Sequence, residues 1–129
     1  PEIAVQANIQ LAQFYLEQDR TTEALEVLDG KSATELGPGW DSSMEEIRVY
    51  ALGTLEMYSE AQTIIQSLKE RWPEEEQVQI PAKILSINLL TQQEQYSEAK
   101  SLLQEALKET SEEGYKEMLA TIGKELAKH

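Results

Sequence analysis

Residues 96–103 read Tyr-Ser-Glu-Ala-Lys-Ser-Leu-Leu, and variants of this stretch occur twice earlier in the chain. Residues 58–65 read Tyr-Ser-Glu-Ala-Gln-Thr-Ile-Ile, and residues 22–28 read Thr-Glu-Ala-Leu-Glu-Val-Leu. All three copies share a hydroxyl residue, Glu, Ala, two variable positions and two aliphatic residues. The shared alanines are 37 and then 38 residues apart, which indicates three repeated units of similar length.

Each copy has the features of a helix start. A hydroxyl side chain can accept hydrogen bonds from free backbone N–H groups, and the Glu that follows suits the positive end of the helix dipole. The hydroxyl residues are Thr22, Ser59 and Ser97. The Ala that follows the Glu in each copy is small enough for a neighbouring helix to approach closely. We therefore expect these three alanines, Ala24, Ala61 and Ala99, to be buried.

A further amphipathic helix is predicted in front of each copy, because apolar residues recur there at helical spacing. These residues are Ala4, Leu11, Ala12 and Tyr15, then Met44, Ile47, Ala51 and Leu55, then Ile84, Ile87 and Leu90. Ser42 and Glu45 can form a capping box at the start of the middle one. Each unit is therefore predicted to be a helix, a short turn and a second helix.

One more helix is predicted after Thr110, which with Glu113 can form a second capping box. Its apolar stripe consists of Tyr115, Met118, Leu119, Ile122 and Leu126. A terminal helix of this kind covers the last apolar face of a repeat array.

The repeated pattern resembles the tetratricopeptide repeat over about residues 5–110. The matching residues are Leu11, Ala12, Tyr15 and Ala24, then Val49, Leu52, Tyr58, Ala61, Ile65 and Pro73, then Ile87, Leu90, Tyr96, Ala99, Leu103 and Ala106. The resemblance implies one all-α domain over 1–129, a right-handed superhelical stack of antiparallel helix pairs. Its expected parts are units at about 5–38, 42–73 and 80–110 and a capping helix at about 111–128.

The chain departs from that family at several positions. Asp19, Glu56 and Glu94 stand where a turn glycine is usual, and Arg48 and Ser86 stand where an apolar residue is usual. The spacing also exceeds the family's period of about 34 residues, so extended loops between units are expected. Gly30 to Gly39 is the clearest candidate for such a loop.

In this family the concave face is lined by the first helix of each unit and binds proteins. Carried over by position, the partner-binding residues expected here are Ile9, Gln13, Leu16, Glu46, Tyr50, Ile84 and Asn88. Some members hold acidic chaperone tails with Lys, Arg and Asn. In the first unit those groups are replaced by Gln6, Ile9, Gln10 and Gln13. The resemblance therefore implies a scaffold or adaptor that binds a peptide or helix with apolar anchors.

Composition argues against several other functions. The 129 residues carry 24 acidic and 11 basic side chains, a net charge of −13 that disfavours binding to nucleic acid or anionic membranes. There is no cysteine, and the only histidine is the terminal His129, so no catalytic, cofactor or metal-binding residues are predicted. Glu74 to Glu76 follow Pro73 and are interpreted as a helix start, not a calcium site. We expect no enzymatic activity.

Other points stay open at this stage. The chain begins Pro1-Glu2, which is consistent with a piece of a longer protein. The alternative function is a self-associating or interdomain structural segment, and a homo-oligomer agrees with it. A cytoplasmic location is favoured over a periplasmic one, although the lack of cysteine fits both.

Overall fold

The computed structural model describes residues 2–129 of the chain. It contains seven α-helices and one short 3-10 helix, and no strand occurs in this range. The helices are α1 (Glu2–Glu17), α2 (Thr21–Leu28), α3 (Pro38–Thr54), α4 (Tyr58–Arg71), α5 (Glu76–Gln92), α6 (Tyr96–Glu109) and α7 (Glu113–Leu126), and the 3-10 helix is η1 (Thr34–Leu36). The predicted all-α fold class is therefore confirmed.

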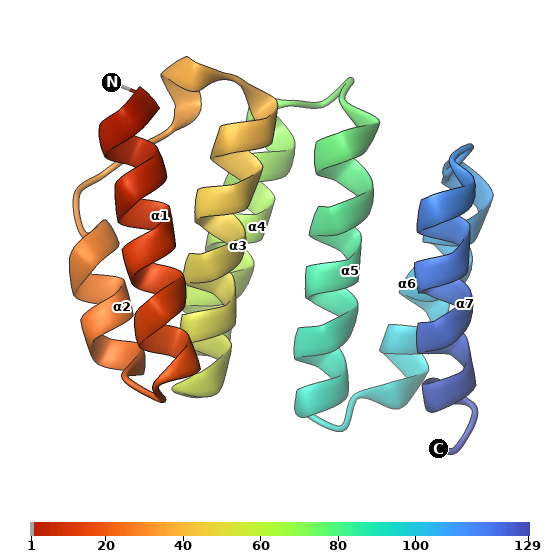
Figure 1. The fold of residues 1–129 in the computed structure, drawn as a ribbon. Coiled ribbons are helices and arrows are strands. Elements are labelled where there is room, and N and C mark those ends of the chain that lie inside the picture. Colours follow the sequence, from red (N-terminus) through yellow and green to blue (C-terminus); the bar gives the residue numbers. More distant parts are fainter. Residues whose placement is uncertain (1) are drawn as a thin grey trace.

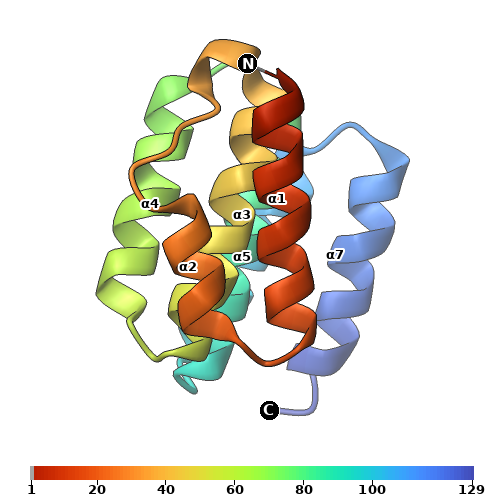
Figure 2. The same ribbon diagram turned by 60° about the vertical axis from the view of Figure 1, so that its left-hand side comes forward.

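The helices form three pairs that contact one another in chain order. Within the pairs α1 packs on α2, α3 on α4, and α5 on α6. Between pairs, α3 contacts both α1 and α2, and α5 contacts both α3 and α4 (Figure 1). The last helix, α7, packs on α6 and α5. Figure 2 shows the same arrangement from the side of α2.

The expected burial of the repeated alanines is confirmed. Ala24, Ala61 and Ala99 are each fully buried, and each belongs to a different cluster of the hydrophobic core. The two aliphatic positions that follow each alanine contribute Leu28, Ile65 and Leu103 to the same clusters. One small residue at the start of the second helix thus brings the two helices of every pair close together.

The turns inside the three pairs have the same backbone geometry. Asp19, Glu56 and Glu94 adopt left-handed conformations with φ of 60°, 61° and 61°. In each turn the N–H of the next residue donates to a carbonyl five residues back, as from Met57 to Leu52 at 2.8 Å. This is the Schellman closure of a helix, which usually uses glycine at the left-handed position. The three non-glycine residues therefore keep the turn but carry backbone strain.

Several predicted helix starts are wrong. The second and third pairs begin at Pro38 and Glu76 instead of about 42 and 80. Pro38 stands in the first turn of α3, after Gly37 with φ of 103°, because its fixed φ suits a helix start. Pro73 lies in a turn before α5 and not at its first position, while Pro81 lies inside that helix.

The predicted side-chain caps are also wrong. Thr22, Ser59 and Ser97 lie inside the first turns of α2, α4 and α6, because the Schellman turn leads directly into each second helix. The residues at the cap positions form no side-chain cap. Glu45 is instead bonded to arginines, and Thr110 Oγ1 donates to Glu76 Oε1 at 2.9 Å.

Some residues of the predicted apolar stripes are exposed. Leu11 and Leu55 are 43% and 39% exposed, and Met118 is 51% exposed. On α1 the side chains that pack in the core are Val5, Ile9, Ala12, Tyr15 and Leu16. On α1 the sequence pattern thus predicted the helix correctly but wrongly included the exposed Leu11 in its buried face.

We expect Ala61→Arg and Ala99→Arg each to destabilise the protein by about 2–4 kcal/mol, because a long charged side chain must enter a fully buried site. Glu60→Gln, one residue from Ala61 but exposed, should change stability by less than about 0.5 kcal/mol. Urea denaturation midpoints measure both effects. Equal midpoints for Ala61→Arg and Glu60→Gln would contradict the packing role of the alanine.

Glu94→Gly should stabilise the protein by about 0.5–1 kcal/mol, because relief of the left-handed strain exceeds the greater backbone entropy of glycine. Glu98→Gly is the matched control, since Glu98 is exposed and lies in the first turn of α6, where glycine lowers helix propensity and removes a carboxylate that suits the helix dipole. Thermal unfolding of the two variants should therefore shift in opposite directions. A loss of stability in both would show that the Glu94 side chain makes a compensating interaction.

Candidate protein-binding groove

An open groove of about 550 Å³ lies where the first helices of the three pairs meet. Its lining residues are Gln13, Leu16 and Glu17 from α1, Ser43, Glu46, Ile47 and Tyr50 from α3, and Leu85 and Asn88 from α5. Contacts of α3 with both α1 and α5 hold these helices side by side (Figure 1). No lysine or arginine is part of this lining.

Five of the seven predicted partner-binding residues line the groove. They are Gln13, Leu16, Glu46, Tyr50 and Asn88. Gln13, Tyr50 and Asn88 occupy the same place in the three units, because they are spaced by 37 and 38 residues like the turn residues. Tyr50 is 61% exposed, so its ring is free to contact another molecule.

The other two predicted residues do not line the groove. Ile9 and Ile84 are 6% and 8% exposed and belong to two clusters of the core. Ile47 and Leu85, which follow the predicted residues Glu46 and Ile84, line the groove, whereas Gln10, which follows Ile9, does not. Ile47 was predicted to lie in the apolar stripe of its helix, and it is both a core residue, 6% exposed, and part of the groove lining.

Glu46 occupies the repeat position that is isoleucine in the other two units, at Ile9 and Ile84. Its side chain reaches the surface, but the neighbouring helices reduce its contact with water. This desolvation raises the pKa of Glu46 above its ordinary value. The groove therefore holds a partly desolvated carboxylate, and its lining residues include no cation.

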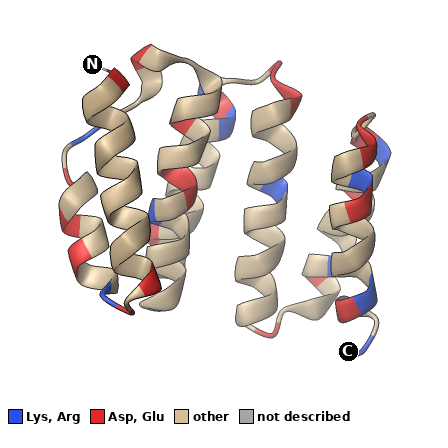
Figure 3. Cartoon of the chain, viewed as in Figure 1, with Lys and Arg blue, Asp and Glu red and all other residues tan. Residues whose placement is uncertain are grey.

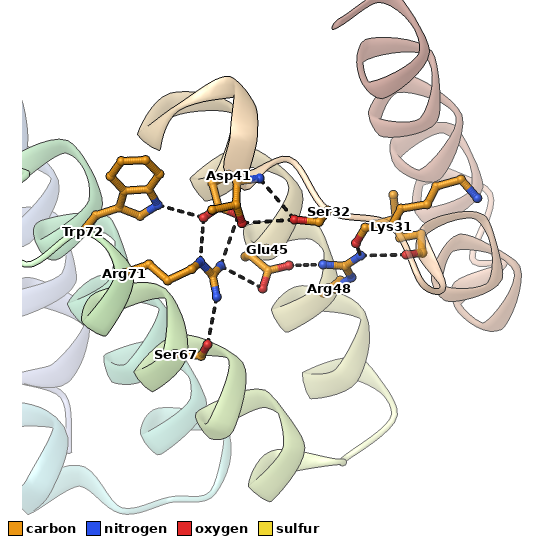
Figure 4. A network of polar contacts seen from close by, with 10 residues as sticks. Lys31, Ser32, Asp41, Glu45, Arg48, Ser67, Arg71 and Trp72 are labelled. Atoms are coloured by element: carbon orange, nitrogen blue, oxygen red, sulfur yellow. Dashed lines mark hydrogen bonds and ion pairs between the residues drawn. The ribbon is translucent and has the colours of Figure 1, made fainter. Parts of the chain in front are cut away.

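A buried polar network fixes the opposite face of α3. Arg71 at the end of α4 donates to both carboxylate oxygens of Asp41, at 2.8 and 3.1 Å, and to Glu45 at 3.4 Å (Figure 4). Trp72 Nε1 donates to Asp41 Oδ2 at 2.8 Å. Asp41 is only 2% exposed, and its carboxylate raises the pKa of the Arg71 guanidinium.

The same network continues to the first pair. Arg48 donates to Glu45, to the Leu28 carbonyl at 2.7 Å and to the Lys31 carbonyl. It thereby provides partners for carbonyl groups at the end of α2, which a helix terminus leaves without internal partners. Every fully buried side-chain nitrogen or oxygen in residues 2–129 has a hydrogen-bond partner. These hydrogen bonds explain why a polar residue, Arg48, stands at a position where the resemblance predicted an apolar one.

The network determines how α3 faces the groove. With about 3.6 residues per turn, Asp41, Glu45 and Arg48 lie on the side of α3 opposite the groove residues. Because that side is tied to the ends of both α2 and α4, α3 cannot rotate freely about its axis. Glu46 and Tyr50 are therefore held toward the groove by bonds formed on the far side of their helix.

Other features noted in the sequence have structural partners. Glu76 accepts hydrogen bonds from the Ser111 N–H and from two hydroxyl groups, which lower its pKa. The His129 imidazole stacks on the Tyr96 ring with 4.0 Å between centroids. Within residues 2–129 no acidic, histidine or cysteine group has an arrangement suited to a metal ion. None of the helices described is long and apolar enough to span a bilayer.

No protein-family model matches this chain, and comparisons with curated proteins and with solved structures found no match.

We expect Glu46→Gln to raise the melting temperature at pH 7. A raised pKa in the folded state means that ionising Glu46 costs more there than in the unfolded chain. This cost is present at neutral pH and disappears in acid, below about pH 4, where both states are protonated. Calorimetry across this range should show a stabilisation that declines as the pH falls, and a constant difference would contradict the desolvation of Glu46.

Proposed function

We propose that this chain is a protein–protein interaction module of the tetratricopeptide type, which acts as a scaffold or adaptor. Its groove would bind a peptide or helix of a partner protein along α1, α3 and α5. The supporting observation is that three first helices contribute equivalent residues, Gln13, Tyr50 and Asn88, to one open groove. A binding surface of this kind follows from repeated units placed side by side.

The chemistry of the groove favours a partner with apolar anchors. Leu16, Ile47 and Leu85 provide an apolar floor, and Tyr50 adds an exposed aromatic ring beside it. The amides of Gln13 and Asn88 can donate to and accept from a peptide backbone. Aromatic and aliphatic side chains supply most of the free energy in such interfaces, and polar groups set the orientation.

The charge of the groove disfavours acidic partners. Glu17 and Glu46 are its only charged lining residues, so an acidic peptide would meet like charges there. Nucleic acid is disfavoured for the same reason, since the whole chain carries a net charge of −13. We assign no catalytic step to the groove. Ser43 and Tyr50 supply the hydroxyl groups of the lining, and neither histidine nor lysine, which usually activates a hydroxyl nucleophile, is among the lining residues.

Tyr50→Ala should weaken partner binding about tenfold or more, which corresponds to roughly 1.4 kcal/mol. Peptides selected on the wild-type chain from a random library would serve as ligands, with affinities measured by fluorescence anisotropy. Because apolar contacts dominate, the affinity should depend only weakly on salt. Met118→Ala is the matched control, since Met118 is an exposed apolar residue of α7 outside the groove.

A different outcome of the same experiment would contradict the groove as the binding site. Selected peptides that are basic, bind Tyr50→Ala as tightly as wild type and dissociate steeply with added salt would place binding on the acidic outer surface. The groove would then not be the binding site.

A further inference from the structure

Glu46 stands at a repeat position that the other two units fill with a buried isoleucine. Ile9 and Ile84 occupy this position on α1 and α5, and both pack in the core. On α3 the same position is exposed and lines the groove, and Tyr50 lies one turn further along the same side of the helix. The middle unit thus replaces an apolar packing residue by a carboxylate on the central helix of the groove.

Charged side chains are sparse on the three helices that form the groove (Figure 3). The first of them, α1, is charged only at its two ends, and Lys83 of α5 is paired with carboxylates of α6. On α3, Glu45 and Arg48 pair with each other on the side opposite the groove. No ion pair among residues 2–129 includes Glu46. Its carboxylate therefore reaches the groove without a cation from the described part of the chain.

The position of Glu46 makes its charge costly while the groove is empty. The neighbouring helices reduce its contact with water, and this desolvation raises the pKa of Glu46. A cation supplied by a partner would offset this cost. An apolar or acidic group placed there would bury the carboxylate further and leave it unpaired. The groove therefore selects a partner by the group that the partner places against Glu46.

The chain contains an internal example of how an arginine is held by two such groups. The Arg20 guanidinium donates to both carboxylate oxygens of Glu23 and lies over the Tyr15 ring, 4.7 Å from its centroid. A planar guanidinium can pair with a carboxylate along its edge while its face stacks on an aromatic ring. Glu46 and Tyr50 offer the same two groups, a carboxylate and an exposed aromatic ring, on adjacent turns of α3.

We infer that Glu46 and Tyr50 form a subsite for an arginine of the partner segment, with apolar residues of that segment on either side of it. The inference rests on the proposed function, since it names the chemistry of the segment that the groove binds. The guanidinium pairs with the Glu46 carboxylate and lies on the Tyr50 ring, while Leu16, Ile47 and Leu85 contact the apolar residues. Arginine is favoured over lysine, because an ammonium group lacks the planar fork that pairs and stacks at once.

Parallel selections from one random peptide library test the subsite. Peptides selected on the wild-type chain should carry an arginine at a fixed distance from an apolar residue. Selection on Glu46→Ile, which restores the residue of the other two units, should give an aliphatic residue at that place instead. Equal arginine content in the two selected pools would overturn the inference.

A double-mutant cycle measures the pairing itself. Replacing the arginine of a selected peptide by glutamine should weaken binding to the wild-type chain at least about tenfold, or roughly 1.4 kcal/mol. The same replacement should change binding to Glu46→Gln by less than about twofold, because the carboxylate is then absent. Glu46→Gln is expected to be more stable than the wild type at pH 7, so weaker binding would not result from unfolding. Fluorescence anisotropy gives the four affinities.

Glu17→Gln is the matched control, because it removes the same charge from the same groove lining. Glu17 lies at the end of α1, and the residue one turn before it is Gln13 instead of an aromatic residue. In this variant the loss on replacing the peptide arginine should remain at least about tenfold. If Glu17→Gln and Glu46→Gln abolished that loss equally, the peptide would sense only the negative charge of the groove, and the subsite would be overturned.

The results distinguish this inference from the proposed function. Peptides that bind Tyr50→Ala weakly but bind Glu46→Gln as tightly as the wild type would support the groove and overturn the arginine subsite. Peptides that bind Tyr50→Ala as tightly as the wild type would overturn both, as would a library that gives no ligand. The salt dependence should stay weak, because one ion pair is formed and apolar contacts surround it.

Discussion

The approach of the two helices in each pair depends on one methyl side chain at the start of the second helix. Ala24, Ala61 and Ala99 are fully buried, and the larger aliphatic residues after them can reach the core only because the helices are this close. The left-handed turns before them fix the angle at which the second helix begins. From these two constraints follow the spacing of the first helices and, between them, the groove.

Most of the fold could be predicted because it is determined by residues that are local and repeated. The alanines, the aliphatic pairs and the length of the units are all visible as a period in the sequence. The turn substitutions Asp19, Glu56 and Glu94 also marked positions that the structure shows to be left-handed. The helix starts could not be predicted in the same way. Ser42 and Glu45 match a capping box, but Ser42 lies inside α3, because Gly37 and Pro38 already start that helix.

Most of the candidate site could be predicted from the repeat. Gln13, Tyr50 and Asn88 were located by the repeat, but Ile9 and Ile84 were assigned to the surface and are buried. Adjacent residues on a helix differ by about 100° in direction, so a small error in helix rotation exchanges a groove residue for a core residue. The rotation of α3 is set by ion pairs that span about the length of a unit, as between Asp41 and Arg71, and such pairs leave no local pattern.

The ends of the second helices are held by a different side chain in each pair. Arg48 bonds the carbonyls at the end of α2, whereas Gln79 Nε2 donates to the Lys69 and Trp72 carbonyls at the end of α4. After α6, Thr110 and Ser111 are bonded by Glu76. The units are therefore alike in backbone but not interchangeable. Moving the third pair to the second place would put Ser86 where Arg48 is needed, so the order of the units along the chain is itself encoded in these contacts.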